Sequence, residues 1–131
     1  AVVSLLLDTH AIYWWLNDDP RLSGASRGAI LAAPRVVVSA VSVWEFAIKL
    51  SIGKMRFDLG EALRQLALDG FDRLGIEDRH CRRRADLPLR HRDPFDRMLV
   101  AQALEEGLTL LSDDRDMPLY REAGLALLPC G

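Results

Sequence analysis

The sequence lacks the features of secreted, membrane and highly charged proteins. Its 131 residues contain only two cysteines, Cys81 and Cys130, which is too few for a disulfide framework and indicates a reducing, cytoplasmic setting. The apolar opening is broken at Asp8, so it is too short to span a bilayer, and it lacks the charged start of a signal peptide. A formal net charge of −2 excludes a strongly basic nucleic-acid coat protein, so any nucleic-acid binding must be local.

Apolar segments rich in branched residues alternate with segments of helical periodicity. We expect strands near residues 2–7, 36–38, 71–76, 108–111 and 125–128. We expect helices near residues 9–16, 23–33, 42–50, 61–69, 77–86, 94–106 and 116–123, with Ser42 and Glu45 forming an S-x-x-E capping box. This alternation predicts an α/β fold of three layers, α/β/α, with a central, mainly parallel sheet. No linker divides the chain, so residues 1–131 are expected to form one domain.

Four acidic residues stand where such a sheet binds ligands. Asp8 directly follows the first strand, and Asp114 follows the fourth, and the carboxyl ends of parallel strands are the usual ligand-binding edge. Glu45 and Asp96 fall in the first turn of expected helices. Each alone has a simpler explanation, because a carboxylate near a helix N-terminus gains about 0.3–1 kcal/mol from the helix dipole.

Together the four acids predict a metal site, because each adjoins strongly apolar sequence. If they share one pocket, repulsion and desolvation raise some of their pKa values unless a cation balances the charge. Oxygen-only ligands favour Mg²⁺ or Mn²⁺ over zinc. Such an ion polarises a scissile phosphate and lowers the pKa of a bound water, so phosphodiester hydrolysis is the expected reaction.

Four segments, in order along the chain, carry a family resemblance: LLLDTHAIYWWL, VSAVSVWEFAIKLSIGKM, HRDPFDRMLVAQALEEGLTLLSDD and LYREAGLALL. This ordered set resembles a PIN domain of the VapC-toxin type. The resemblance implies an endoribonuclease that cleaves RNA with Mg²⁺ or Mn²⁺ bound by Asp8, Glu45, Asp96 and Asp114. It also implies a five-stranded parallel sheet, a homodimer, and a small VapB-type antitoxin that blocks the acidic pocket and represses the joint operon.

Two of these assignments require a choice between neighbouring acids. The family's third acid precedes an apolar, alanine-rich helix, which favours Asp96 and leaves Asp93 as an N-terminal cap or outer-shell group. The fourth usually follows a hydroxyl residue by two positions, and Ser112 favours Asp114 over Asp113 and Asp116. Accessory roles are expected for four residues: Thr9, Ser112, Asp93 and Asp116.

The densest basic run precedes the third acid and is a candidate RNA-binding surface. The candidate RNA-binding residues are Arg82, Arg83, Arg84, Arg92, Arg97 and, on the other rim, Lys49. The alternative is a solvated helix face paired with Glu77, Asp78 and Asp86.

Aromatic and soft side chains suggest other roles, most of which packing explains equally well. Trp14, Trp15 and Trp44 are able to stack unpaired bases, but at least two of them are expected in the core or a dimer interface. His10 is a minor candidate for general base or substrate contact. A soft-metal site at His80 and Cys81 lacks a matching pair nearby, and His91 is expected to be a solvated loop residue.

Three rival functions remain open. A phosphatase with Asp8 as nucleophile needs a second acid close behind it, which Thr9 and His10 do not supply. A phospho-receiver signalling module needs an acceptor aspartate at the end of the third strand, and residues 71–78 lack a clear one. A non-catalytic PIN binding module has no need of all four acids.

Overall fold

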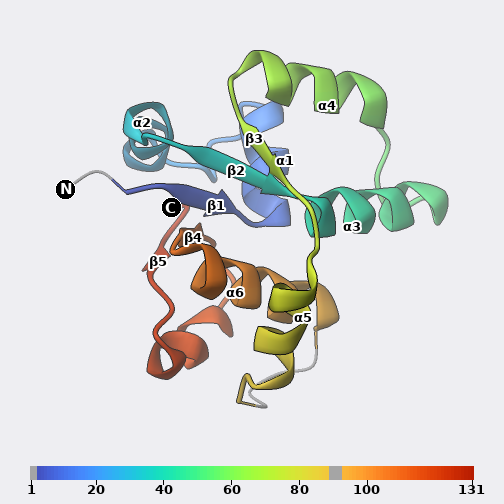
Figure 1. Cartoon of the computed structure of the whole chain (residues 1–131). Helices are drawn as coiled ribbons and strands as arrows, with labels where there is room; N and C mark the ends of the chain where they lie inside the picture. The colour runs from blue at the N-terminus through green and yellow to red at the C-terminus, as the bar shows by residue number, and fades with distance from the viewer. Residues whose placement is uncertain (1–2, 89–92) are drawn as a thin grey trace.

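The computed structural model describes residues 3–88 and 93–131 and contains one five-stranded, fully parallel sheet (Figure 1). The strand order is β3-β2-β1-β4-β5. The strands are β1 (Leu5–Leu7), β2 (Val36–Ser39), β3 (Asp72–Leu74), β4 (Thr109–Leu111) and β5 (Leu127–Leu128). The helices are α1 (Thr9–Leu16), α2 (Gly24–Ala32), α3 (Ala40–Ser51), α4 (Leu59–Leu68), α5 (Asp78–Ala85), α6 (Pro94–Glu106) and the 3₁₀ helix η1 (Met117–Ala123). The expected α/β class and parallel sheet are confirmed.

The sheet lies between two helical layers because its side chains alternate between two cores. Leu6, Val37 and Leu110 point into a core shared with α6 and η1. Leu5 and Leu7 point the opposite way, into a core that α1, α2 and α4 close. In Figure 1, α1, α2 and α4 accordingly lie on one side of the sheet and α5 and α6 on the other. Both faces are therefore buried, which accounts for the continuous apolar strands.

Local capping determines where several helices begin, and one predicted start is wrong. Helix α3 begins at Ala40, and the Ser39 hydroxyl caps it by accepting a hydrogen bond from the Val41 N–H at 3.0 Å. Ser42 and Glu45 therefore lie inside the helix rather than forming its capping box. The chain passes directly from β2 into the helix, because a serine already stands at the strand's end. For residues 116–123 the structure contains a 3₁₀ helix.

The strand order separates the fold from one rival function. Phospho-receiver modules have the order 2-1-3-4-5, whereas here the third strand lies at the sheet edge beside β2. The chain winds outward from β1 to β3, then returns to place β4 on the other side of β1. This reversal creates a switch point between β1 and β4, where ligands bind in open α/β sheets. Among residues 3–88 and 93–131, no helix is long and apolar enough to cross a membrane.

Candidate active site

Asp8 lies at the switch point, immediately beyond β1. Its backbone N–H donates to Leu111 O at 3.1 Å, which ties it to the end of β4. One carboxylate oxygen caps α1 by accepting from the Ala11 N–H at 2.8 Å, and the other accepts from the Ser112 hydroxyl. Only 4% of the residue is exposed, and burial raises the pKa of Asp8 although both hydrogen bonds oppose the shift. Asp8 is thus a buried carboxyl held rigidly by both strands.

Asp96 and Asp114 approach Asp8 from two other elements. Asp96 is in the first turn of α6, and Asp114 follows β4, where its N–H donates to Ser112 Oγ at 3.1 Å. Burial raises the pKa of Asp96 to about 8, with further contributions from Asp93, from Asp114, whose side chain is a hydrogen-bond partner, and from Asp8. These acids therefore share one electrostatic environment, as the sequence predicts for a common pocket.

Glu45 reaches this group through Thr9 and has no direct contact with Asp8. Its Oε1 accepts from the Thr9 hydroxyl at 2.6 Å, and its Oε2 is 3.0 Å from Lys49 Nζ, one helical turn along α3. The Thr9 Oγ1 also lies 3.0 Å from Ser42 Oγ. Because Thr9 follows Asp8 in the chain, these contacts place Glu45 beside the acidic edge. Glu45 was expected in the first turn of its helix. It lies further along the helix, because α3 begins earlier, at Ala40.

The acidic edge, formed by Asp8, Asp96, Asp114 and Glu45, has ligand atoms of the kind that a hard cation prefers. Their present arrangement is less suited to binding one. Within the two described stretches, no three His, Cys, Asp or Glu side chains are arranged closely enough to hold a metal ion. The donors available are nevertheless all carboxylate oxygens, which suit Mg²⁺ or Mn²⁺. The raised pKa of Asp96 means that this site retains a proton near neutral pH, so it favours a positive charge.

The neighbouring acids divide into capping and cavity-lining residues. Asp93 caps α6 by accepting from the N–H groups of Phe95 and Asp96 at 2.9 and 3.0 Å, as the sequence predicts. Asp113, which sequence reasoning treated only as a competitor, accepts from the Cys130 N–H at 2.6 Å and anchors the C-terminal segment. No local pattern signals this contact, because its partners are 17 residues apart in the chain.

A cavity of about 500 Å³ opens at the acidic edge. Its lining comes from the start of α1 and from the segment after β4: Asp8, His10, Trp14, Asp113, Asp114, Arg115 and Asp116. Asp96 and Glu45 do not line this cavity. The sequence predicts acids at this edge but not that His10 and Trp14 line the same cavity, for which the signal is their four-residue spacing.

One predicted RNA-binding residue is wrong. Arg97 is only 7% exposed, and its guanidinium donates to Pro88 O at 3.0 Å and Tyr120 Oη at 3.1 Å. It also reaches the carbonyl oxygens of Arg84 and Leu87, both at 3.5 Å. Arg97 therefore joins α5 to α6 and η1, and its charge is buried away from any ligand.

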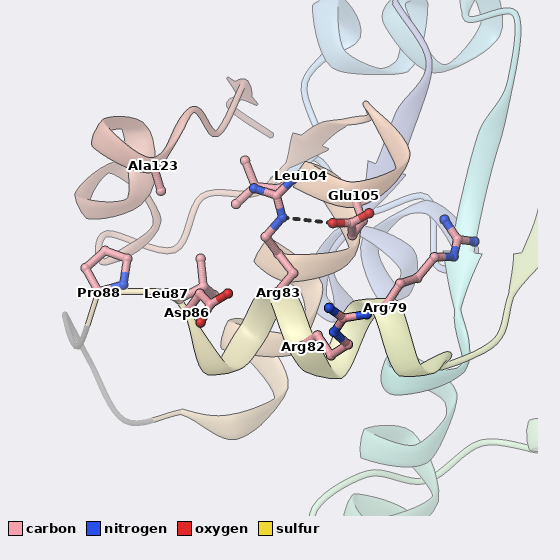
Figure 2. A pocket seen from close by; sticks show the side chains of 9 residues that line it. All are labelled: Arg79, Arg82, Arg83, Asp86, Leu87, Pro88, Leu104, Glu105 and Ala123. Carbon is pink, nitrogen blue, oxygen red and sulfur yellow. Dashed lines mark hydrogen bonds and ion pairs between the residues drawn. The ribbon is translucent and has the colours of Figure 1, made fainter.

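The remaining basic candidates have more varied surroundings. Arg82 and Arg83 line a separate cavity of about 460 Å³ between α5, α6 and η1, shown in Figure 2. Arg83 pairs with Glu105 at 3.0 Å, whereas Arg82 is exposed and has no ion pair within the described stretches. Arg84 is half-buried, and Lys49 pairs with Glu45. The predictions for Arg92 and His91 concern positions outside the described residues.

The tryptophans and the isolated histidine mostly have packing roles. Trp14 and Trp15 are half-buried against one core, as expected for two of the three, whereas Trp44 is 57% exposed and packs edge-on against Phe95. His80 is fully buried, with Nε2 3.0 Å from Glu106 Oε2 and Nδ1 accepting from the Glu77 N–H at 3.0 Å. His80 therefore supports the α5–α6 contact.

Comparison with known proteins gives concordant results. The family model of the PIN domain matches residues 5–123. The chain is 33% identical over 128 residues to Ribonuclease VapC22 of Mycobacterium tuberculosis, covering 92% of this chain and 94% of that protein. The fold resembles a chain of VapBC2 from Rickettsia felis bound to a promoter DNA fragment, with a TM-score of 0.72 at 13% identity, covering 98% of this chain and 99% of that one.

A second solved structure supports the same fold. A chain of the FitAcB structure from Neisseria gonorrhoeae matches with a TM-score of 0.68 at 23% identity, covering 95% of this chain and 96% of that chain. The family match covers most of the sequence and includes three of the acids at the sheet's carboxyl edge, Asp8, Asp96 and Asp114. The chain therefore belongs to the PIN-domain family and, within it, is similar to the VapC type.

Proposed function

We propose that this protein is a metal-dependent endoribonuclease that hydrolyses phosphodiester bonds of RNA, and that it acts as the toxin of a toxin–antitoxin pair. The observation that carries the proposal is the electrostatic coupling of Asp96 to Asp114 and Asp8 beside the β1–β4 switch point, where burial and these neighbours raise the pKa of Asp96 to about 8. A VapC ribonuclease matched along nearly the whole chain supports the same chemistry.

Four acidic residues share one role in the proposed site, and neighbouring hydroxyl groups orient two of them. Asp8, Asp96, Asp114 and, beside Thr9, Glu45 would hold Mg²⁺ or Mn²⁺, which would polarise the scissile phosphate and lower the pKa of the attacking water. Ser112 orients Asp8 by donating its hydroxyl hydrogen, and Thr9 orients Glu45 in the same way. Asp116 stays a proposed accessory residue, since its N–H donates to Asp114 Oδ1 at 2.8 Å.

The RNA backbone requires positive charge that the acidic edge does not provide. Arg82 is exposed and free to bind phosphate, and Arg84 and Lys49 stay candidates at the flanks. Arg83 is a weaker candidate, because a contact with RNA would first break its ion pair with Glu105.

The proposed partners are a second copy of the chain and a VapB-type antitoxin. Exposed apolar residues at four-residue spacing on α3 and at its C-cap support a protein-binding surface: Trp44 is 57%, Ile48 36% and Ile52 59% exposed. The structural relatives include VapBC assemblies from several bacteria, which supports an antitoxin partner acting in the same cytoplasmic compartment. Co-purification with the product of a neighbouring gene tests this part.

Cleavage of single-stranded RNA by the purified protein tests the proposed reaction. We expect cutting with Mg²⁺ or Mn²⁺, none in excess EDTA, and a loss of roughly 100-fold or more in Asp8→Asn and Asp96→Asn, because each removes a carboxylate that would hold the ion that stabilises the transition state. Asp78→Asn, an exposed carboxylate in the first turn of α5, is the matched control and should keep full activity. Undiminished cutting in EDTA or by Asp96→Asn would refute the proposal.

A further inference from the structure

The cavity at the acidic edge has an aromatic wall that the proposed hydrolysis does not use. His10 and Trp14 line the cavity together with Asp8 and Asp114. They are four residues apart on α1, so their side chains lie on the same face of the helix. Their ring centroids are 5.8 Å apart, and the ring planes differ by 24°, which is a stacked arrangement.

Surrounding contacts hold this wall in place. The Arg21 guanidinium lies 5.1 Å from the centre of the Trp14 ring and is itself paired with Asp19 at 2.7 Å. The carbonyl of Trp14 accepts from the Asp19 N–H at 2.9 Å, which fixes the turn after α1. Trp14 is half-buried, whereas His10 is exposed. The wall thus consists of a supported tryptophan and an accessible imidazole ring.

The chemistry of the cavity favours an uncharged, flat ligand group at this wall. Four aspartates and one arginine, Arg115, line the remainder of the cavity, so its net charge is negative and an anion alone would be repelled there. A nucleobase is neutral, and its π-face stacks on an aromatic side chain whatever the base. Single-stranded RNA presents unpaired bases in this way, with the phosphate on the adjacent backbone. A volume of about 500 Å³ falls within the range of small-ligand sites.

We propose that His10 and Trp14 form a stacking platform for one unpaired nucleobase next to the phosphate that is cut. This inference rests on the proposed ribonuclease function and adds a substrate requirement to it. The platform makes the enzyme selective for single-stranded RNA with a base at that position and tolerant of the identity of the base. It assigns His10 a stacking role in place of acid–base chemistry.

Binding to an uncleaved RNA tests the platform directly. The Asp96→Asn protein is titrated with a short single-stranded RNA carrying 2-aminopurine, once with all bases present and once with an abasic nucleotide at each position in turn. We expect fluorescence quenching at one position, and an abasic nucleotide there should weaken binding roughly 5- to 150-fold, as loss of one stacked base does. Equal affinity for every abasic series overturns the proposal.

Paired substitutions in the same Asp96→Asn background distinguish stacking from other roles of the two side chains. His10→Ala and Trp14→Leu should weaken binding by a similar factor, whereas His10→Phe and Trp14→Phe keep a π-face and should retain most of it. If His10→Phe binds as poorly as His10→Ala, the imidazole acts through its nitrogens and the proposal is wrong. His10 is exposed, so its variants should fold normally even if those of Trp14 do not.

The two proposals fail in different ways. Tight, base-dependent binding by Asp96→Asn without any cutting by the unmodified protein refutes the ribonuclease and leaves the platform supported. Cutting by the unmodified protein with no change in His10→Ala binding refutes the platform and leaves the ribonuclease.

Discussion

At the carboxyl edge of the sheet, Asp8 and Asp114 raise the cost of ionising Asp96, whereas on the α5–α6 face arginines and glutamates neutralise one another. The pKa of Asp96 rises to about 8 at the first region. At the second, Arg83 pairs with Glu105 (Figure 2). Arg79 pairs with Glu77 and Glu106. Acidic side chains without a neutralising partner therefore indicate the candidate site, whereas paired arginines and glutamates indicate a structural surface.

Arg97 is an exception to this comparison. It directly follows Asp96 in the chain, yet its hydrogen bonds join α6 to α5 and η1. We expect Arg97→Ala to lower the free energy of unfolding by about 2–4 kcal/mol, since it removes the donor that reaches the buried Leu87 O and the half-buried Pro88 O. Urea denaturation measures this loss. The matched control Arg82→Ala, on exposed α5 surface, should change stability by less than about 0.5 kcal/mol, and equal losses would contradict the buried role.

The pH dependence of stability sharpens the contrast from the acidic side. Between about pH 4 and pH 8 the folded protein keeps a proton on Asp96 that the unfolded chain has released, so the stability of the metal-free protein should fall as pH rises through this window. Asp96→Asn should remove this slope and add about 1–2 kcal/mol at pH 8, a figure reduced for partial exposure. Thermal melts in EDTA at pH 5 and pH 8 measure both effects.

A divalent cation should reverse this trend. Mg²⁺ or Mn²⁺ should raise the melting temperature of the unmodified protein more at pH 8 than at pH 5, and raise that of Asp96→Asn much less. Asp78→Asn serves as control and should respond as the unmodified protein does. An unmodified protein that is more stable at pH 8 than at pH 5 in EDTA would contradict the crowded-acid account.

The smallest effect is expected at the paired arginines. A double-mutant cycle of Arg83→Ala and Glu105→Ala should give a coupling energy of about 0.2–1 kcal/mol that shrinks at high salt, because the pair is partly exposed. A coupling above about 2 kcal/mol would show that this face is not the screened surface that the comparison assumes.

Much of this arrangement was predictable from local sequence. The apolar runs before Asp8 and Asp114 identified β1 and β4, and Asp93 with Pro94 identified the start of α6, because strand burial and helix capping depend on neighbouring residues. The predicted start of α3 was wrong because Ser39 and Ser42 are the same residue type and so are equally good N-terminal caps. Only the end of β2 at Ser39 selects between them.

The buried structural role of Arg97 was not predictable, because an arginine next to a proposed metal-binding acid is equally consistent with a contact to RNA. Its partners Pro88 and Tyr120 lie 9 and 23 residues away and converge only when α5, α6 and η1 pack together. The sequence indicated Trp14 and His10 as separate candidates but did not predict that they line one cavity together, since four-residue spacing on α1 describes a core stripe equally well.

The order of apolar and polar residues by itself determined the approximate positions of the strands and helices, and it predicted four acids as the candidate site. Hydrophobic periodicity and the signals that end an element depend on only a few neighbouring residues. The tertiary structure decided which charges face one another, which arginine is buried and which rings border the acids. Those outcomes depend on the crossover that places β4 beside β1, and contacts between residues about 100 positions apart, such as Asp8 and Ser112, leave no local pattern.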